Sequence, residues 1–159
     1  MDCVICEGHP SMIPGKAPTH VIVGGITYKA ELPAEICPKC HRPYFSMADE
    51  ARFEQSVALR VALDCVPHPE GVRVMRKALG LSTVELSKLM DTVQESISRW
   101  ETGKRPLDKK VYAVLCLLTA DSLLGSKQVV GMLKKLVAGV SPEKEVVVDL
   151  IPESKKFEF

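Results

Sequence analysis

The sequence predicts an α+β protein, in which a small β-rich domain that binds zinc precedes an all-α domain with a helix-turn-helix. Three observations support this prediction. Four of the six cysteines form two CxxC pairs, at residues 3–6 and 37–40. Strand-like runs lie between the pairs, and from residue 46 onward apolar residues recur with a helical period. We place the domains at residues 1–66 and 67–140, with a tail at 141–159.

The predicted metal ligands are Cys3, Cys6, Cys37 and Cys40. Each pair can turn two thiolates toward one point, and two pairs complete the tetrahedral sulfur shell that suits zinc. The gap between the pairs exceeds the usual ribbon spacing of about 15–20 residues, and an inserted hairpin accounts for the excess. We therefore predict a structural Zn²⁺ site, with iron on the same four sulfurs as the alternative.

Other uses of the cysteines fit less well. Residues 37–41 match the haem-attachment pattern CxxCH, but covalent haem would leave Cys3 and Cys6 unexplained. A redox dithiol would need a βαβ context, which the sequence does not predict. His9 and His41 are further candidate ligands, but four thiolates already complete the shell. The remaining cysteines lie among apolar helical neighbours and are predicted to be core residues: Cys65 and Cys116.

The elements of the first domain follow from local signals. The runs 19–23 and 26–32 flank Gly24-Gly25, and a glycine pair between β-branched runs is typical of a two-residue hairpin turn. A helix is predicted from Ser46, whose Ser-x-x-Asp start resembles a capping box, to about residue 63. Pro67 and Pro69 cannot continue that helix, so the domain boundary is placed there.

The second domain is predicted to hold short helices with clear start and stop signals. Ser82 and Thr92 each begin a capping box, and Gly80 and Gly103 follow predicted helix ends. The predicted helices cover residues 72–79, 84–90, 92–102, 111–124 and 129–137. The tail holds one strand-like run, 145–151, which needs a partner either in the N-terminal sheet or in another subunit.

Charge and hydropathy narrow the class of protein. The net charge of +1 divides into −2 for residues 1–68, +5 for residues 69–140 and −2 for residues 141–159. Positive charge is thus concentrated in the segment that holds the predicted helix-turn-helix, as expected of a segment that approaches DNA phosphates. No apolar run is long enough to cross a bilayer, and no secretory signal pattern is present. We therefore expect no membrane contact and a cytoplasmic, nucleoid-associated protein with reduced thiols.

The predicted helix 92–102 has two different faces. At about 100° per residue, one face carries Val93, Ile97 and Trp100, which are expected to pack inward. Polar side chains that can pair with base edges occupy the other face, and such side chains are also common on any solvated helix. This polar face comprises Gln94, Glu95, Ser98, Arg99 and Thr102.

The segment Met75–Pro106 resembles the Xre/phage-repressor helix-turn-helix family. The matching features are Leu79-Gly80-Leu81-Ser82, Glu85-Leu86, Ile97-Ser98-Arg99 and Glu101-Thr102-Gly103-Lys104. The resemblance implies a lambda-repressor-like domain whose second motif helix enters the major groove.

Residue roles follow from the same resemblance. It implies base contacts by Gln94, Glu95 and Arg99, beside Ser98 on the same face. It implies contacts near the DNA backbone by Thr83, Val93, and Lys104 or Arg105. It also implies a structural ion pair between Arg76 and Glu101. Thr83 stands where the family often has a phosphate-binding glutamine.

The order of features over residues 1–112 resembles the MqsA-type (YgiT-like) antitoxins. That resemblance implies structural zinc, a homodimer that binds a pseudo-palindromic operator in double-stranded DNA, and an N-terminal domain that binds a protein toxin. The chain from Val111 onward extends beyond the family's usual end. The alternatives are a free-standing regulator and a protein-interaction module. No enzyme activity is expected, because four thiolates leave no open coordination position.

Overall fold

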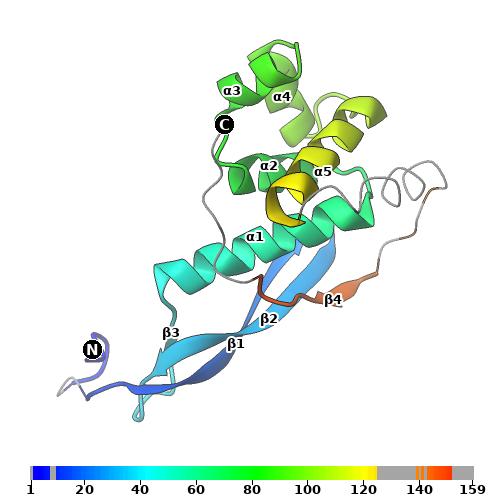
Figure 1. The fold of residues 1–159 in the computed structure, drawn as a ribbon. Coiled ribbons are helices and arrows are strands. Elements are labelled where there is room, and N and C mark those ends of the chain that lie inside the picture. Colours follow the sequence, from blue (N-terminus) through cyan, green and yellow to red (C-terminus); the bar gives the residue numbers. More distant parts are fainter. Residues whose placement is uncertain (1, 8–9, 125–138, 140, 142, 152–159) are drawn as a thin grey trace.

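The computed structural model describes residues 2–7, 10–124, 139, 141 and 143–151. Its elements follow in the order β1 (Ile13–Val23), β2 (Ile26–Ile36), β3 (Pro43–Tyr44), α1 (Met47–Asp64), α2 (Pro69–Ala78), α3 (Thr83–Leu89), α4 (Gln94–Glu101), α5 (Lys109–Leu124) and β4 (Glu145–Val147). The described part is therefore α+β, as predicted. Helix α1 lies across the sheet, and the other helices stack on its far side (Figure 1).

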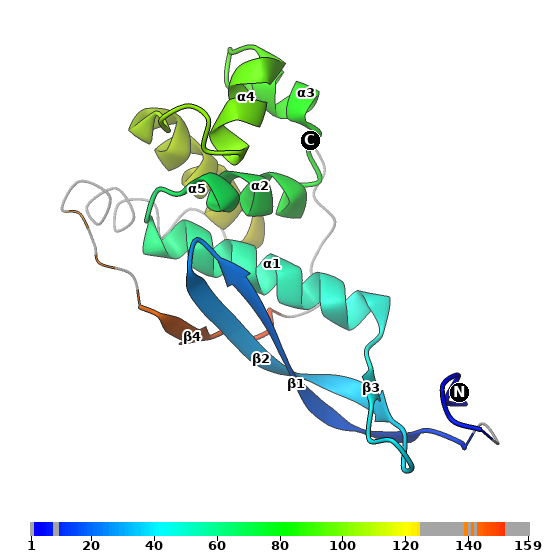
Figure 2. The same cartoon turned by 180° about the vertical axis from the view of Figure 1, so that it is seen from behind.

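The predicted hairpin is confirmed and is longer than the two strand-like runs. Strands β1 and β2 pair antiparallel from Val23↔Ile26 to Ile13↔Ile36. The turn residues Gly24 and Gly25 have φ of 59° and 80°, which glycine adopts at little cost. Together the strands form a long twisted ribbon whose turn reaches the helices and whose open end lies beside β3, near the N-terminus (Figure 2).

Helix α1 connects the sheet to the helical half. The Ser46 hydroxyl accepts a hydrogen bond from the Asp49 amide at 3.1 Å, which satisfies one free N–H of the first turn. The helix ends at Cys65, whose φ of 55° is left-handed. One face buries apolar side chains that include Phe53, Val57 and Val61. The predicted helix is thus confirmed.

Helix α2 begins at Pro69, earlier than the predicted start at residue 72. Proline has no N–H and suits the first turn of a helix, so Pro69 begins α2 as well as closing the preceding segment. His68 caps this helix, because its Nδ1 accepts a hydrogen bond from the Gly71 amide at 2.9 Å.

Helices α3 and α4 are short and adjacent. The predicted capping box of Ser82 and Glu85 is present at the start of α3. The predicted capping box at Thr92 is wrong: α4 begins at Gln94, with Val93 as an N-cap that makes no side-chain hydrogen bond. The Thr92 amide instead donates to the Ser87 carbonyl at 2.9 Å, so Thr92 belongs to the end of the α3 turn.

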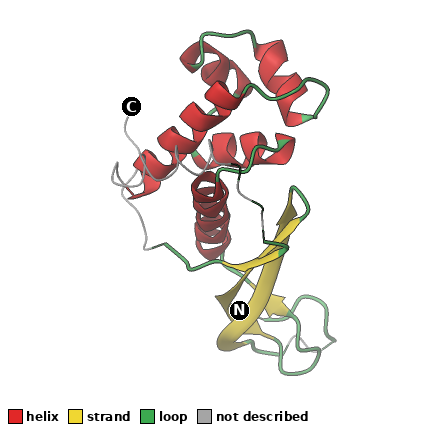
Figure 3. Ribbon diagram, turned by 90° about the vertical axis from the view of Figure 1, so that its right-hand side faces the viewer, coloured by secondary structure: helices red, strands yellow, loops and turns green. Residues whose placement is uncertain are grey.

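One buried cluster includes side chains from both sides of the predicted boundary near residue 66. It contains Tyr28 from β2, Val57 from α1, Met75 from α2 and Tyr112 from α5. A second, small cluster contains Cys3, Met12 and Cys37 at the opposite end of the hairpin. The sheet, α1 and the helices above it are seen in turn in the side view of Figure 3. The packing therefore joins the turn end of the hairpin to the helices and leaves the cysteine end apart.

The C-terminal strand joins the N-terminal sheet, which was one of its two predicted partners. Strand β4 pairs in parallel with β2, with Val146 opposite Tyr28. The strand stops at Val147, earlier than the predicted run to residue 151. Beyond it the Ile151 amide donates to Ser56 Oγ at 3.1 Å. The predicted helix 129–137 lies outside the described residues.

Candidate functional site

The four predicted metal ligands converge at the open end of the hairpin. The Sγ atoms of Cys3, Cys6, Cys37 and Cys40 all lie within 4.8 Å of one another. The Cys3–Cys40 sulfurs are 3.9 Å apart and the Cys6–Cys37 sulfurs are 3.8 Å apart. A tetrahedral site with Zn–S bonds of about 2.3 Å has sulfur–sulfur edges of about 3.8 Å. The arrangement therefore matches the size of one tetrahedrally bound cation.

Local backbone geometry brings the second pair into position. Cys37 directly follows β2 and begins a tight turn. In this turn the His41 amide donates to the Cys37 carbonyl at 2.9 Å. His41 has a left-handed φ of 57°, which reverses the chain. The Cys40 amide points at Cys37 Sγ at 3.5 Å. This turn aims both sulfurs of the pair at the first pair.

The environment of the sulfurs favours thiolates at two positions. Backbone hydrogen bonding, chiefly from Ile5, lowers the pKa of Cys3 to about 6. The amide of Cys40 is the main cause of a lowered pKa for Cys37. Desolvation, with hydrogen bonds among the sulfurs, raises the pKa of Cys6 to about 12. Four thiolates so close together repel one another, and a bound divalent cation removes that repulsion and deprotonates all four.

Sequence reasoning missed one neighbour of the cysteines. The Tyr44 hydroxyl lies 3.8 Å from Cys3 Sγ, because β3 pairs Tyr44 with Glu35 at the end of β2. A two-residue strand carries no periodic signal, so this contact could not be predicted from the pattern of residues. His41 is exposed and is not part of the cysteine cluster. His9 lies outside the described residues. Cys65 and Cys116 are buried in the main cluster, as predicted.

The apolar face of α4 differs from the prediction at one residue. Ile97 is fully buried and Trp100 is 5% exposed, as expected, but Val93 is 64% exposed. Val93 lies in extended backbone before the helix, so the helical period does not apply to it. Ser96 is buried instead, and its hydroxyl accepts a hydrogen bond from Arg105 Nη1 at 2.9 Å.

The polar face of α4 is exposed and internally connected. Gln94, Glu95, Ser98 and Arg99 are all exposed. Arg99 Nη2 donates to Glu95 Oε1, one helical turn away. Gln94 Nε2 donates to Thr83 Oγ1 at 2.9 Å, which links the starts of α3 and α4. The glutamate and the arginine of the predicted contact set are therefore held together rather than spread apart.

The other predicted residues lie around this face. Lys104 is exposed in the segment after α4. Arg105 is exposed too, but its guanidinium lies 5.9 Å above the Trp100 ring as well as on Ser96. The contacts of Arg105 with Trp100 and Ser96 therefore account for much of the conformation of its side chain.

Arg76 and Glu101 form an ion pair between α2 and the end of α4. Arg76 Nε lies 2.5 Å from Glu101 Oε1, and Nη2 donates to Oε2 at 3.2 Å. The side chains are 12% and 9% exposed. Arg76 Nη1 also donates to the Leu81 carbonyl at 2.7 Å, so one guanidinium connects α2, the segment before α3 and α4.

Comparisons with family models, with curated proteins and with solved structures find no match to this chain. Within the residues that the structure describes, no helix combines the length and the hydropathy needed to cross a membrane.

Proposed function

We propose that the protein is a sequence-specific DNA-binding transcriptional regulator with a structural Zn²⁺ in its Cys₄ site. We further propose that it is the antitoxin of a toxin–antitoxin pair and represses its own operon. The observation that carries the DNA-binding proposal is the exposed polar face of α4, held on a short pair of helices by Arg76 and Glu101.

The geometry of α3 and α4 supports this reading. Both helices are short, they pack against each other, and α4 turns Ile97 and Trp100 into the core while its polar side chains face outward. In a helix-turn-helix, the second helix presents such residues to base edges and its N-terminal amides to a phosphate. Lys88 on α3 and Lys104 just after α4 are exposed and positively charged, which suits the DNA backbone.

The chemistry of the cysteine site supports structural zinc. Four sulfurs at tetrahedral spacing would close the coordination shell, which is typical of sites that stabilise a fold. Cys3, Cys6, Cys37 and Cys40 would hold the ion, whose chemistry there is to tie the N-terminus to the β2–β3 turn. Iron on the same sulfurs is the alternative cation.

Operator binding as a homodimer and capture of a toxin complete the proposal. Exposed apolar side chains on α5, Val114 at 43% and Leu124 at 51%, offer surface for a second copy. A toxin would be bound by the N-terminal half, as the resemblance to MqsA-type antitoxins implies. A free-standing regulator without a toxin is the alternative, and the neighbouring gene distinguishes the two.

A DNA-binding experiment tests the central part of the proposal. Duplexes selected from a random pool by the wild-type protein are titrated with wild type, with Arg99→Ala and with the control Arg42→Ala at the cysteine end. We expect Arg99→Ala to lose about 1–3 kcal/mol of binding free energy and to relax preference at one base pair. We expect the control to bind as wild type. Unchanged affinity and unchanged preference in Arg99→Ala would refute the assignment of α4 as the reading helix.

A further inference from the structure

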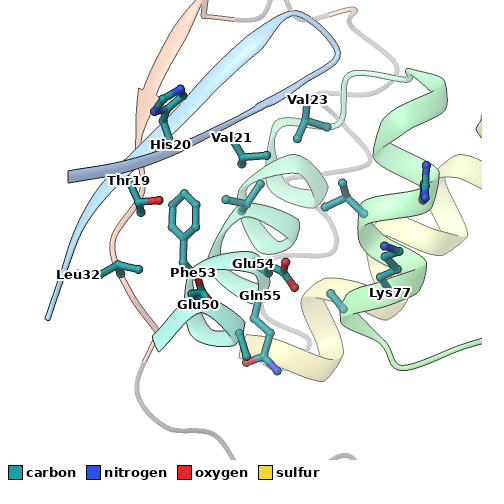
Figure 4. Close-up of a pocket in the computed structure, with 15 residues that line it drawn as sticks. Thr19, His20, Val21, Val23, Leu32, Glu50, Phe53, Glu54, Gln55 and Lys77 are labelled. Atoms are coloured by element: carbon teal, nitrogen blue, oxygen red, sulfur yellow. The ribbon is translucent and has the colours of Figure 1, made fainter. Parts of the chain in front are cut away.

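A groove lies beside the hairpin, on the side away from β3 and β4. It has a volume of about 580 Å³, and its floor is α1, with β1 along one side and α2 along the other. Val21 and Val23 point from β1 toward the helices, and Phe53 and Glu54 rise from α1 (Figure 4). The volume lies within the range of protein sites that hold ligands, about 300–1,000 Å³.

The β1 side of the groove is an open sheet edge. Strand β1 pairs with β2, and within the described residues no strand lies on its other side. A two-residue turn is flanked by a hydrogen-bonded pair, here Val23 and Ile26. Odd-numbered residues of β1 therefore bond to β2. The hydrogen bonds on the other side of β2 are consistent with this assignment. The Thr27 amide and the Lys29 carbonyl point away from β1 and bond to the chain around β4.

The backbone groups of even-numbered β1 residues consequently point away from β2. Two of these positions are Pro14 and Pro18, which have no N–H and so block strand pairing toward the cysteine end. His20 and Ile22 retain both N–H and C=O groups, and they lie in the part of β1 that borders the groove. Toward the cysteine end only Lys16, between the two prolines, keeps an outward N–H, so the uninterrupted open edge lies beside the groove.

Some apolar side chains that line the groove are left partly exposed. Val23 is 2% exposed and belongs to the main buried cluster, but Val21, two residues before it on the same face of β1, is 39% exposed. Val74 on the opposite wall is only partly buried. Apolar side chains thus line a space that the described residues leave open. The exposed cations Arg73 and Lys77 lie on the α2 wall, and the exposed carboxylates Glu50 and Glu54 lie on α1, so positive charge is confined to the α2 side of the groove.

We propose that this groove binds a single extended segment of a partner protein, which adds a strand to β1 at His20 and Ile22. Alternate side chains of the segment would be apolar and would face Val21, Phe53 and Val74. An acidic side chain would meet Arg73 and Lys77 on the α2 wall. The five residues 19–23 span about 16 Å of strand, enough for a short linear motif.

The inference deepens the partner part of the proposed function, but its test uses neither a toxin nor DNA, so either proposal can fail alone. The probe is a random nonapeptide library displayed on phage, selected against the full-length, zinc-loaded protein. One selected peptide is synthesised with a fluorophore, and its affinity is measured by anisotropy. We expect the selected sequences to alternate apolar residues with at least one acidic residue.

Two proline variants test the open edge. His20→Pro removes an outward N–H inside the groove, and Lys16→Pro removes an equivalent outward N–H between Pro14 and Pro18. Neither N–H bonds to β2, so both variants should keep the hairpin. We expect His20→Pro to bind the selected peptide about tenfold more weakly and Lys16→Pro to bind it as wild type does. Lys77→Glu should weaken binding as well, and it should not alter α1 or the sheet.

Amide exchange provides a direct readout of strand addition. In the free protein the amides of His20 and Ile22 should exchange quickly and those of Val21 and Val23 slowly, and the selected peptide should protect His20 and Ile22. The proposal is overturned if no peptide is enriched, or if His20→Pro binds as tightly as wild type. It is also overturned if the two amides become exposed only after residues 152–159 are removed, or if protection of them depends on dimer formation.

Discussion

At the residue scale, the ion pair between Arg76 and Glu101 ties the end of α4 to α2. The resemblance to the helix-turn-helix family implies this pair, and the structure brings the two side chains together across α2 and α4. Sequence reasoning failed at Val93 and Thr92 for a physical reason. The helical period and the capping pattern both assume where the helix begins, and a shift of two residues at the start exposes Val93 and removes Thr92 from the cap.

Removal of one partner of this pair should be costly, because it leaves a largely buried charge without its counterion. We expect Glu101→Gln to lower the free energy of unfolding by about 3 kcal/mol. The double variant Arg76→Met with Glu101→Met should be less destabilised than the sum of the two single methionine variants. Urea unfolding followed by circular dichroism measures the wild type and all four variants. Additive effects would show that the pair contributes no coupling.

His68 should make stability depend on pH. Burial lowers its pKa from the ordinary 6.5 because desolvation disfavours the charged ring, and the nearby Glu70 opposes this only in part. The folded state therefore favours neutral His68, whose Nδ1 caps α2. As pH falls below about 6.5 the unfolded chain takes up a proton that the folded chain resists, so stability decreases. Above that pH the contribution is complete.

The matched variant is His68→Asn, which keeps an acceptor at the N-cap and removes the titrating ring. We expect the wild type to lose more stability than this variant between pH 7.5 and pH 5.5. Urea midpoints at the two pH values supply the comparison. Equal losses in both proteins would mean that His68 titrates alike in the folded and unfolded states.

At the element scale, the strands and helices divide into those with local signals and those without. The hairpin follows from Gly24-Gly25 between β-branched runs, and α3 follows from its capping box. Strand β3 has only two residues and no period, so local reasoning could not find it. The partner of β4 was left open, because a lone strand-like run indicates no neighbour. Parallel pairing with β2 joins residues far apart in the sequence.

The strand β4 should stabilise the sheet through one buried side chain. Val146 is 4% exposed and Val147 beside it is 65% exposed. We expect Val146→Ala to lower the free energy of unfolding by about 2 kcal/mol, because it removes buried apolar surface and leaves a small cavity. Val147→Ala should change it by less than about 0.5 kcal/mol. Chemical denaturation of both variants tests the pairing, and similar effects for the two would contradict the observed register.

At the scale of the whole molecule, the chain has two separate sources of stability. The cysteine end depends on a small cluster around Cys3 and Cys37, and the rest of the sheet shares the large cluster with the helices. The sequence predicted the metal ligands because chemistry and spacing coincide in CxxC pairs. It did not predict that Tyr28 and Tyr112 would share one core, because such contacts depend on long-range packing. Whether residues 1–66 and 67–140 act as independent domains stays a prediction.

Removal of the metal should therefore affect one end of the molecule. We expect a strong chelator, or Cys37→Ser, to collapse the amide dispersion of residues 3–12 and 37–44, because metal binding there is coupled to folding. Amides of residues 19–30 and of the helices should keep their shifts. Two-dimensional NMR spectra with and without chelator provide the test. Loss of the helical signals as well would show that the two clusters fold as one unit.

We propose that α4 reads DNA while the sheet does not touch it, and NMR titration with a selected duplex tests this proposal. We expect the largest amide shift changes to cluster at the start of α4, from Gln94 to Arg99, with smaller changes near Thr83 and Lys104. Amides of the hairpin should stay unchanged. Shift changes centred on the hairpin or the cysteine site, with α4 unaffected, would refute the proposal.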